Sequence, residues 1–81
     1  MQQNVERGYT YMEFYYYNNN EDDKGRHEVH TENCSHQPYP RNRSYIGYFS
    51  NCHDAINKAK QEHPYMKFDG CYYCCYSCHQ G

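Results

Sequence analysis

The sequence predicts a small α+β domain, and three features lead to this fold class. A tyrosine-rich segment, a polar turn and a short β-forming segment follow one another over residues 9–30, as in a β-hairpin. A third β-forming segment is followed by a stretch with apolar residues at helical spacing. The chain then ends in a cysteine knuckle, with four cysteines and a histidine within residues 71–79.

The apolar residues are too few to stabilise such a domain by themselves. The 81 residues make one domain at most, with residues 1–8 as a flexible lead and 9–81 as the folded part. They include twelve tyrosines, which can build a core if their hydroxyls find partners, but no leucine. Ordering a residue costs about 1.5 kcal/mol, whereas buried apolar surface returns about 25 cal/mol per Å². Short chains with this balance usually carry disulfides or a structural metal, so the six cysteines and six histidines are the expected staple.

Alternation along the first strand, 9–17, divides its side chains between two faces. We expect Met12, Phe14 and Tyr16 to face the core. The opposite face is a candidate protein-binding surface, because tyrosine is enriched at the centres of interfaces. Its tyrosines are Tyr9, Tyr11, Tyr15 and Tyr17.

The next segments alternate between turns and strands. Residues 18–25 form a polar turn that ends in glycine, and residues 26–30 make the return strand of the hairpin. Pro38 and Pro40 exclude a helix from residues 34–42, which we expect to be loop. Residues 43–49, RSYIGYF, are the third strand.

A single helix is expected between the third strand and the cysteine knuckle. Ser50 is a good N-cap, Asp54 suits the first turn, and Pro64 ends the helix after His63. The apolar stripe consists of Cys52, Ala55, Ile56 and Ala59. Cys52 is therefore expected to be a thiol in the core, and Gly70 to make the turn into the knuckle.

Two closely spaced pairs of cysteine and histidine match the ligand spacing of a zinc site. Zinc in structural sites takes four Cys or His ligands in a tetrahedron. The early pair is His30-x-x-x-Cys34, and the late pair is Cys71-x-x-Cys74. We predict zinc as the cofactor, held by these four residues. The overlapping late cluster leaves three possible substitutes for a ligand, namely Cys75, Cys78 and His79.

Other uses of the cysteines are less well supported. Cys75-Tyr-Ser-Cys78-His79 matches the c-type haem motif C-x-x-C-H, but export and a haem pocket would be needed as well. A set of disulfides is the stronger rival, although adjacent Cys74 and Cys75 cannot easily pair with each other. A redox enzyme normally places Cys-x-x-Cys at the start of a helix, and the tail offers none. No catalytic constellation is evident, so we do not expect an enzyme.

The N-terminus has no basic region followed by an apolar one, and no apolar run approaches membrane-spanning length. We therefore expect a cytoplasmic protein without membrane contact. In a reducing compartment, clustered cysteines are more often metal ligands than disulfides.

The stretches HTENCSHQP, PRNRSYIGYFSNCHDAINKA and DGCYYC together resemble the metal-binding domain of the bacterial Ada alkyl-DNA repair protein and related short zinc modules. The resemblance covers residues 29–74 and lies in spacing and order. It implies zinc held by His30, Cys34, Cys71 and Cys74. In the Ada domain the first ligand is a cysteine whose thiolate accepts a methyl group from DNA phosphate. Because this chain has His30 there, we expect no methyl transfer.

These observations favour a non-enzymatic zinc-binding domain that acts as a structural or interaction module. A nucleic-acid-binding zinc module is one alternative, since Arg41 and Arg43 lie beside Tyr39 and Tyr45. The net charge of −2 argues against strong phosphate binding. A secreted, disulfide-stapled miniprotein is the other alternative.

Overall fold

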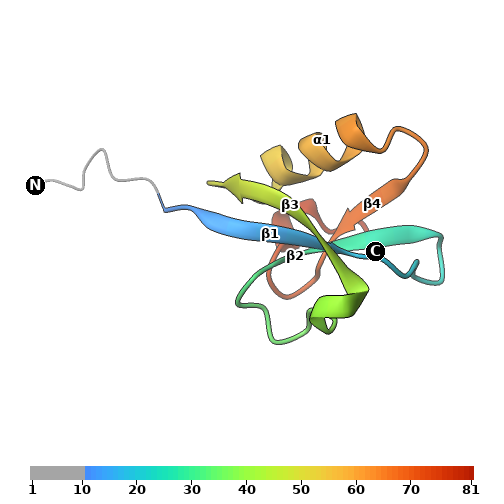
Figure 1. Ribbon diagram of the computed structural model, residues 1–81, viewed down its shortest axis with the longest axis horizontal. Helices are drawn as coiled ribbons and strands as arrows, with labels where there is room; N and C mark the ends of the chain where they lie inside the picture. The colour runs from blue at the N-terminus through green and yellow to red at the C-terminus, as the bar shows by residue number, and fades with distance from the viewer. Residues whose placement is uncertain (1–10) are drawn as a thin grey trace, which may run out of the picture.

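The computed structural model describes residues 11–81, so the expectations for the lead 1–8 and for Tyr9 lie outside the described residues. A four-stranded sheet carries one helix, which confirms the α+β class (Figure 1). The elements are β1 (Glu13–Asn18), β2 (Arg26–Thr31), a 3₁₀ turn η1 (Pro40–Asn42), β3 (Arg43–Phe49), α1 (Cys52–Glu62), β4 (Lys67–Gly70) and a 3₁₀ turn η2 (Tyr76–Cys78). Within residues 11–81, no helix is long and apolar enough to cross a membrane.

The strand order is β3-β1-β2-β4, with the predicted hairpin at the centre. β1 pairs antiparallel with both β2 and β3. β4 pairs parallel with β2, in a register that runs from Arg26 opposite Lys67 to Val29 opposite Gly70. No sequence pattern predicted β4, and η1 forms within residues 34–42, which were expected to be loop throughout.

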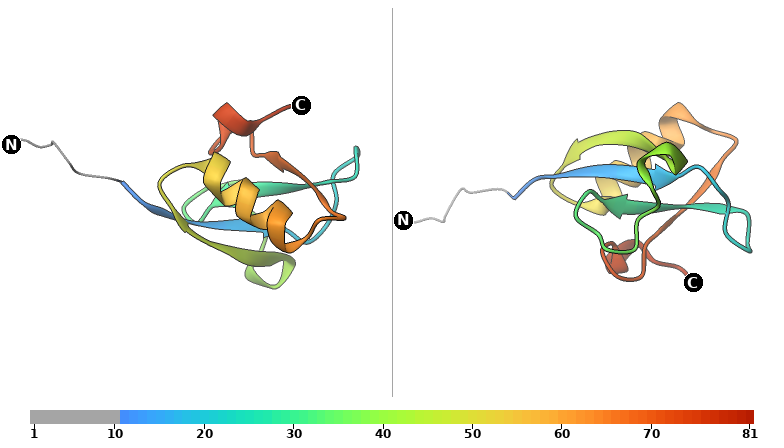
Figure 2. Two further views of the ribbon diagram at one scale, coloured as in Figure 1. Left: turned by 90° about the horizontal axis from the view of Figure 1, so that it is seen from above. Right: turned by 60° about the horizontal axis from the view of Figure 1, so that its bottom comes forward.

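The helix packs on the sheet face opposite to the one expected. Tyr15 and Tyr17 are buried, whereas Phe14 is 41% exposed. α1 lies across this inner face (Figure 2, left), where the neighbouring strands contribute Val29, Ile46 and Phe68. The register of β1 follows these apolar partners, and a one-residue change of register would reverse its faces.

Of the two tyrosines in the core, Tyr17 has a polar partner for its hydroxyl. The hydroxyl of Tyr17 lies 3.4 Å from Nε2 of His63, the C-cap residue of α1. Burial raises the pKa of Tyr15 to about 12, so that its hydroxyl stays neutral. The predicted use of this face as a binding surface is therefore wrong for Tyr15 and Tyr17, while Tyr11 is exposed.

The helix has the predicted buried stripe but begins one residue later than expected. Asn51, in place of Ser50, is the N-cap, and its side-chain oxygen accepts a hydrogen bond of 2.9 Å from the amide of Asp54. The helix buries Cys52, Ala55, Ile56 and Ala59.

Candidate metal centre

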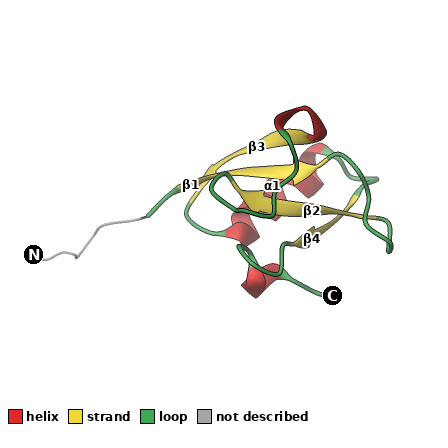
Figure 3. Ribbon diagram, turned by 90° about the horizontal axis from the view of Figure 1, so that it is seen from below, coloured by secondary structure: helices red, strands yellow, loops and turns green. Residues whose placement is uncertain are grey.

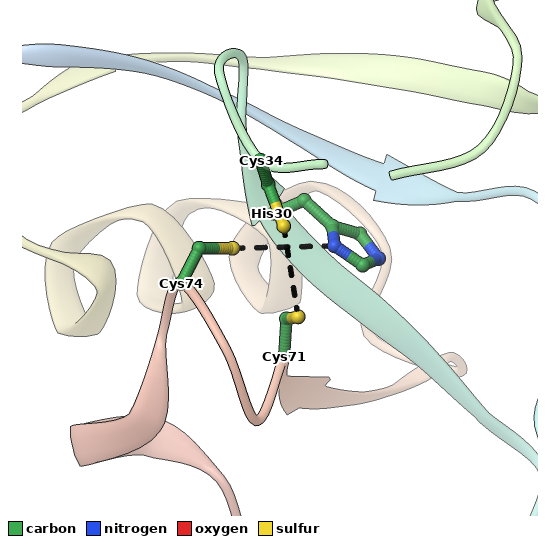
Figure 4. A group of neighbouring side chains, drawn as sticks. All are labelled: His30, Cys34, Cys71 and Cys74. Atoms are coloured by element: carbon green, nitrogen blue, oxygen red, sulfur yellow. Dashed lines mark hydrogen bonds between the residues drawn. The ribbon is translucent and has the colours of Figure 1, made fainter. Parts of the chain in front are cut away.

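Four sulfur and nitrogen donors from the predicted pairs meet at one end of β2 and β4 (Figure 4). His30 lies on β2 and Cys34 in the turn after it, while Cys71 and Cys74 follow β4. Because β2 and β4 are parallel neighbours, both pairs leave the sheet at the same end. One donor atom from each residue lies within 4.8 Å of all the others. We call this set, His30, Cys34, Cys71 and Cys74, the His/Cys₃ group.

Two separations within the His/Cys₃ group are close to those expected in a tetrahedral zinc site. Sγ of Cys34 lies 3.9 Å from Sγ of Cys71, and Sγ of Cys74 lies 4.0 Å from Nδ1 of His30. Zinc–sulfur bonds of about 2.3 Å in a tetrahedron place neighbouring sulfurs about 3.8 Å apart. An ion therefore fits between these donors with little movement of the chain.

Backbone amides point at all three sulfurs of the His/Cys₃ group. The amide of Thr31 donates to Sγ of Cys74 over 3.3 Å. The amides of His36 and Tyr73 donate over 3.4 Å, to Cys34 and Cys71 respectively. Such donors orient ligating thiolates and spread their negative charge. Each of these hydrogen bonds acts to lower the pKa of its thiol.

Without an ion, the three thiols are nevertheless held in their protonated form. Burial raises the pKa of Cys71 to about 12 and also raises that of Cys34. The pKa of Cys74 is raised by its contact with the Cys75 thiol and by burial. A cation among the sulfurs would reverse this preference, because it stabilises the thiolates directly.

The imidazole of His30 is neutral and has a partner on its far side. Burial, followed by the nearby His36, lowers the pKa of His30 to about 4. Nδ1 faces the thiols, while Nε2 lies 3.5 Å from Oε1 of Glu28. A carboxylate behind the second ring nitrogen is one of the common partners that fix the tautomer of a metal-binding histidine.

The glycine before the knuckle permits a close approach of two chain segments and does not form the predicted turn. Gly70 is the last residue of β4, and its φ is not positive. A Cβ at this position would lie 2.5 Å from the carbonyl oxygen of Cys75 and 2.7 Å from Cβ of Cys78. Only a residue without a side chain lets the tail fold back over β4.

The three possible substitutes lie outside the His/Cys₃ group. Cys75 is buried in the core, with its sulfur 3.9 Å from that of Cys74. Cys78 forms a disulfide with Cys52. His79 faces the other way, with Nδ1 2.9 Å from the carbonyl oxygen of Gly70.

The disulfide between Cys52 and Cys78 corrects the expectation that Cys52 is a free core thiol. Cys52 is buried on the predicted stripe, but its sulfur is bonded to Cys78, with the two Cα atoms 6.6 Å apart. The bond ties the first turn of α1 to η2. The remaining cysteines, Cys34, Cys71, Cys74 and Cys75, are free thiols.

A buried carboxylate fixes the end of the tail. Asp69 is 1% exposed, and its Oδ2 lies 3.5 Å from Nη2 of Arg26 and 3.4 Å from Nδ1 of His79. Its Oδ1 accepts a hydrogen bond of 2.7 Å from the amide of Gln80. No local sequence pattern predicts this contact, because Arg26 reaches Asp69 through the pairing of β2 with β4, and residues 79–80 reach it through the folding back of the tail.

Figure 3 shows the sheet face turned away from α1. Aromatic residues on β1 and β3 that are exposed or half-buried lie on this face. We call it the outer aromatic face, consisting of Phe14, Tyr16, Tyr45 and Tyr48. The ring centroids of Phe14 and Tyr48 are 4.6 Å apart. The guanidinium carbon of Arg43 lies 4.3 Å from the centre of the Tyr16 ring. Tyr16 pairs directly with His30 across β1 and β2, so this face adjoins the His/Cys₃ group.

Comparisons with protein-family models, with curated proteins and with solved structures found no match to this chain.

Proposed function

We propose that the chain is a non-enzymatic zinc-binding domain, in which the ion at the His/Cys₃ group holds the fold together. The convergence of four donors within 4.8 Å of one another carries this proposal. The amides directed at all three sulfurs support it, because they suit thiolates better than thiols.

The choice of zinc follows from the chemistry of the donors. Three thiolates and one imidazole form a soft set that suits zinc, and four protein ligands leave no open position for a substrate. Such a closed site is structural. Structural zinc sites contribute apparent free energies of about 10–16 kcal/mol in small domains. That contribution offsets the small core of this chain, whose large members are Tyr15, Tyr17, Val29, Ile46, Ile56 and Phe68.

X-ray absorption at the zinc edge tests the ligand set directly. We expect one zinc per chain with three sulfurs and one nitrogen in its first shell. Four sulfurs in the first shell would mean that Cys75, and not His30, is the fourth ligand. A chain that is purified without metal and binds no zinc on titration would overturn the proposal.

The resemblance to the Ada metal-binding domain is consistent with the same four ligand positions, but it does not extend to the chemistry. A zinc-bound imidazole is a far weaker nucleophile than a zinc-bound thiolate, so His30 cannot take the place of the methyl-accepting cysteine. We propose that the domain acts by binding a partner.

The outer aromatic face supports an interaction role, and the stacked Arg43 favours single-stranded nucleic acid as a second candidate partner. Bases stack on exposed aromatic rings, and arginine pairs with phosphate. Fluorescence anisotropy of a labelled oligonucleotide against salt tests this candidate. We expect Tyr45→Ala to weaken binding about tenfold, from stacking energies of about 1–3 kcal/mol per base. Tyr65→Ala is the matched control, because Tyr65 is 99% exposed and lies outside this face. No binding by the wild type would leave a protein partner as the proposed role.

A further inference from the structure

We propose that the chain has a second zinc site, which the disulfide between Cys52 and Cys78 closes and its reduction opens. This inference goes beyond the structural zinc site and does not depend on it. The ligands are Cys52, His53 and Cys78.

These three residues form the second set of metal-compatible donors in the described part of the chain. One donor atom from each lies within 4.8 Å of the other two. Cys52 and His53 occupy the first turn of α1, and Cys78 ends η2. Contacts between β4 and η2 and between α1 and β4 hold the two segments together independently of the disulfide. The donors therefore stay near one another after reduction.

The spacing of the backbone suits a metal as well as a disulfide. The Cα atoms of Cys52 and Cys78 are 6.6 Å apart, close to the upper end of the range of about 4.4–6.8 Å found for disulfides. Two zinc-bound sulfurs lie about 3.8 Å apart, as follows from zinc–sulfur bonds of about 2.3 Å. Rotation of the two side chains can provide this separation without moving the backbone.

The residues around the second site give a zinc ion access from solvent and give the thiolate of Cys52 a hydrogen-bond donor. His53 is exposed, and a cavity of 190 Å³ is lined by His53, Cys78 and His79 among others. An ion can enter from this cavity, which also leaves room for water as the fourth ligand. The hydroxyl of Ser77 lies 3.3 Å from Sγ of Cys52 and can donate a hydrogen bond to the thiolate form.

The disulfide and the metal exclude each other chemically. A phosphine reductant converts the disulfide to two thiols, which gain two electrons and two protons, while the phosphine takes oxygen from water and becomes the phosphine oxide. Zinc then displaces the two thiol protons to solvent and bonds to both thiolates and to the imidazole. Among residues 11–81, the oxidised chain keeps the His/Cys₃ group as its one set of free donors. The two proposals together therefore predict one zinc ion for the oxidised chain and two for the reduced chain.

Zinc titration followed by native mass spectrometry, with and without a water-soluble phosphine, tests the inference. We expect two zinc ions per reduced chain and one per oxidised chain. His53→Gln should weaken the second binding step at least about tenfold and leave the first unchanged. Because His53 is exposed, this variant does not disturb the core. His63→Gln, at the other end of α1, is the control for loss of an imidazole away from the site and should keep both steps.

The two sites can fail separately. A reduced chain that takes up only one zinc, with that ion lost in Cys71→Ser, would overturn the second site alone. Unchanged second-step binding in both His53→Gln and Cys52→Ser would also overturn it. One zinc that is lost in Cys52→Ser but kept in Cys71→Ser would instead overturn the structural site.

Discussion

Replacing Gly70 with alanine should weaken zinc binding although position 70 carries no ligand. The new methyl group would lie 2.5 Å from the carbonyl oxygen of Cys75, about 0.9 Å short of an ordinary contact of 3.4 Å. The obstacle is backbone, and the methyl is also 2.7 Å from Cβ of Cys78, so no side chain can rotate away to relieve the clash. The knuckle itself has to move.

The size of this movement sets the expected effect. Metal–ligand distances tolerate shifts of about 0.2 Å, so a displacement approaching 0.9 Å next to Cys71 should disturb the His/Cys₃ group. Overpacking of this kind typically costs about 1–3 kcal/mol. We therefore expect zinc affinity to fall about ten- to a hundredfold, since each factor of ten corresponds to about 1.4 kcal/mol.

Competition with a chromophoric chelator measures this affinity, and Gly47→Ala is the control. A Cβ at Gly47 would meet the ring of Phe49 at 2.6 Å, but that ring belongs to a half-buried side chain that can turn. Gly47 also lies on β3, at the opposite edge of the sheet from the knuckle. Wild-type zinc affinity in Gly70→Ala would refute the claim that the close packing of the tail positions the ligands.

Three further predictions follow from the same contacts. Cys34→Ser and Cys71→Ser should each abolish zinc-dependent folding, as measured by circular dichroism. Cys75→Ser should keep one bound zinc, because the sulfur of Cys75 lies outside the His/Cys₃ group. Zinc affinity should rise with pH by about a thousandfold per unit near pH 7, since three thiols with raised pKa values release their protons on binding whereas His30, with a pKa of about 4, releases none. Asp69→Ala should lower the free energy of unfolding of the zinc-loaded protein by about 1–3 kcal/mol in urea titrations. The change removes a buried acceptor that pairs with Arg26 and accepts a hydrogen bond from the amide of Gln80.

Each of these predictions has an outcome that contradicts it. If Cys75→Ser lost its zinc and Cys71→Ser kept it, Cys75 would be the ligand in place of Cys71. Proton release of one or less, measured calorimetrically in buffers of different ionisation enthalpy, would mean that the thiols do not bind as thiolates. A change below about 0.5 kcal/mol in Asp69→Ala, the range of ordinary surface substitutions, would show that its buried contacts add nothing to stability.

The convergence of the two donor pairs was predictable from the sequence because each pair is a local pattern. A spacing of two or three intervening residues keeps the two donors of each pair close together, independently of the tertiary fold. Spacing alone did not decide among the late thiols. The turn into η2 decides, since it directs Cys75 into the core and Cys78 toward α1.

The sheet was less predictable because its signals are tertiary. Both faces of β1 carry aromatic rings, so alternation alone could not show which one is covered by the helix. β1 pairs with β2 and β3, which contribute Val29 and Ile46 to the core. The side chains of Tyr15 and Tyr17 therefore face the helix. β4 has only four residues, and its burial follows from its parallel pairing with β2.

Native mass spectrometry of the protein, purified without added metal or reductant, tests the zinc proposal most directly. We predict one zinc per chain, a mass two hydrogens below that of the fully reduced chain, and loss of folding when a chelator removes the ion. The missing hydrogens correspond to the disulfide between Cys52 and Cys78. A metal-free chain in which Cys34, Cys71 or Cys74 is also paired in a disulfide would contradict the proposal and make this a domain held by disulfides alone.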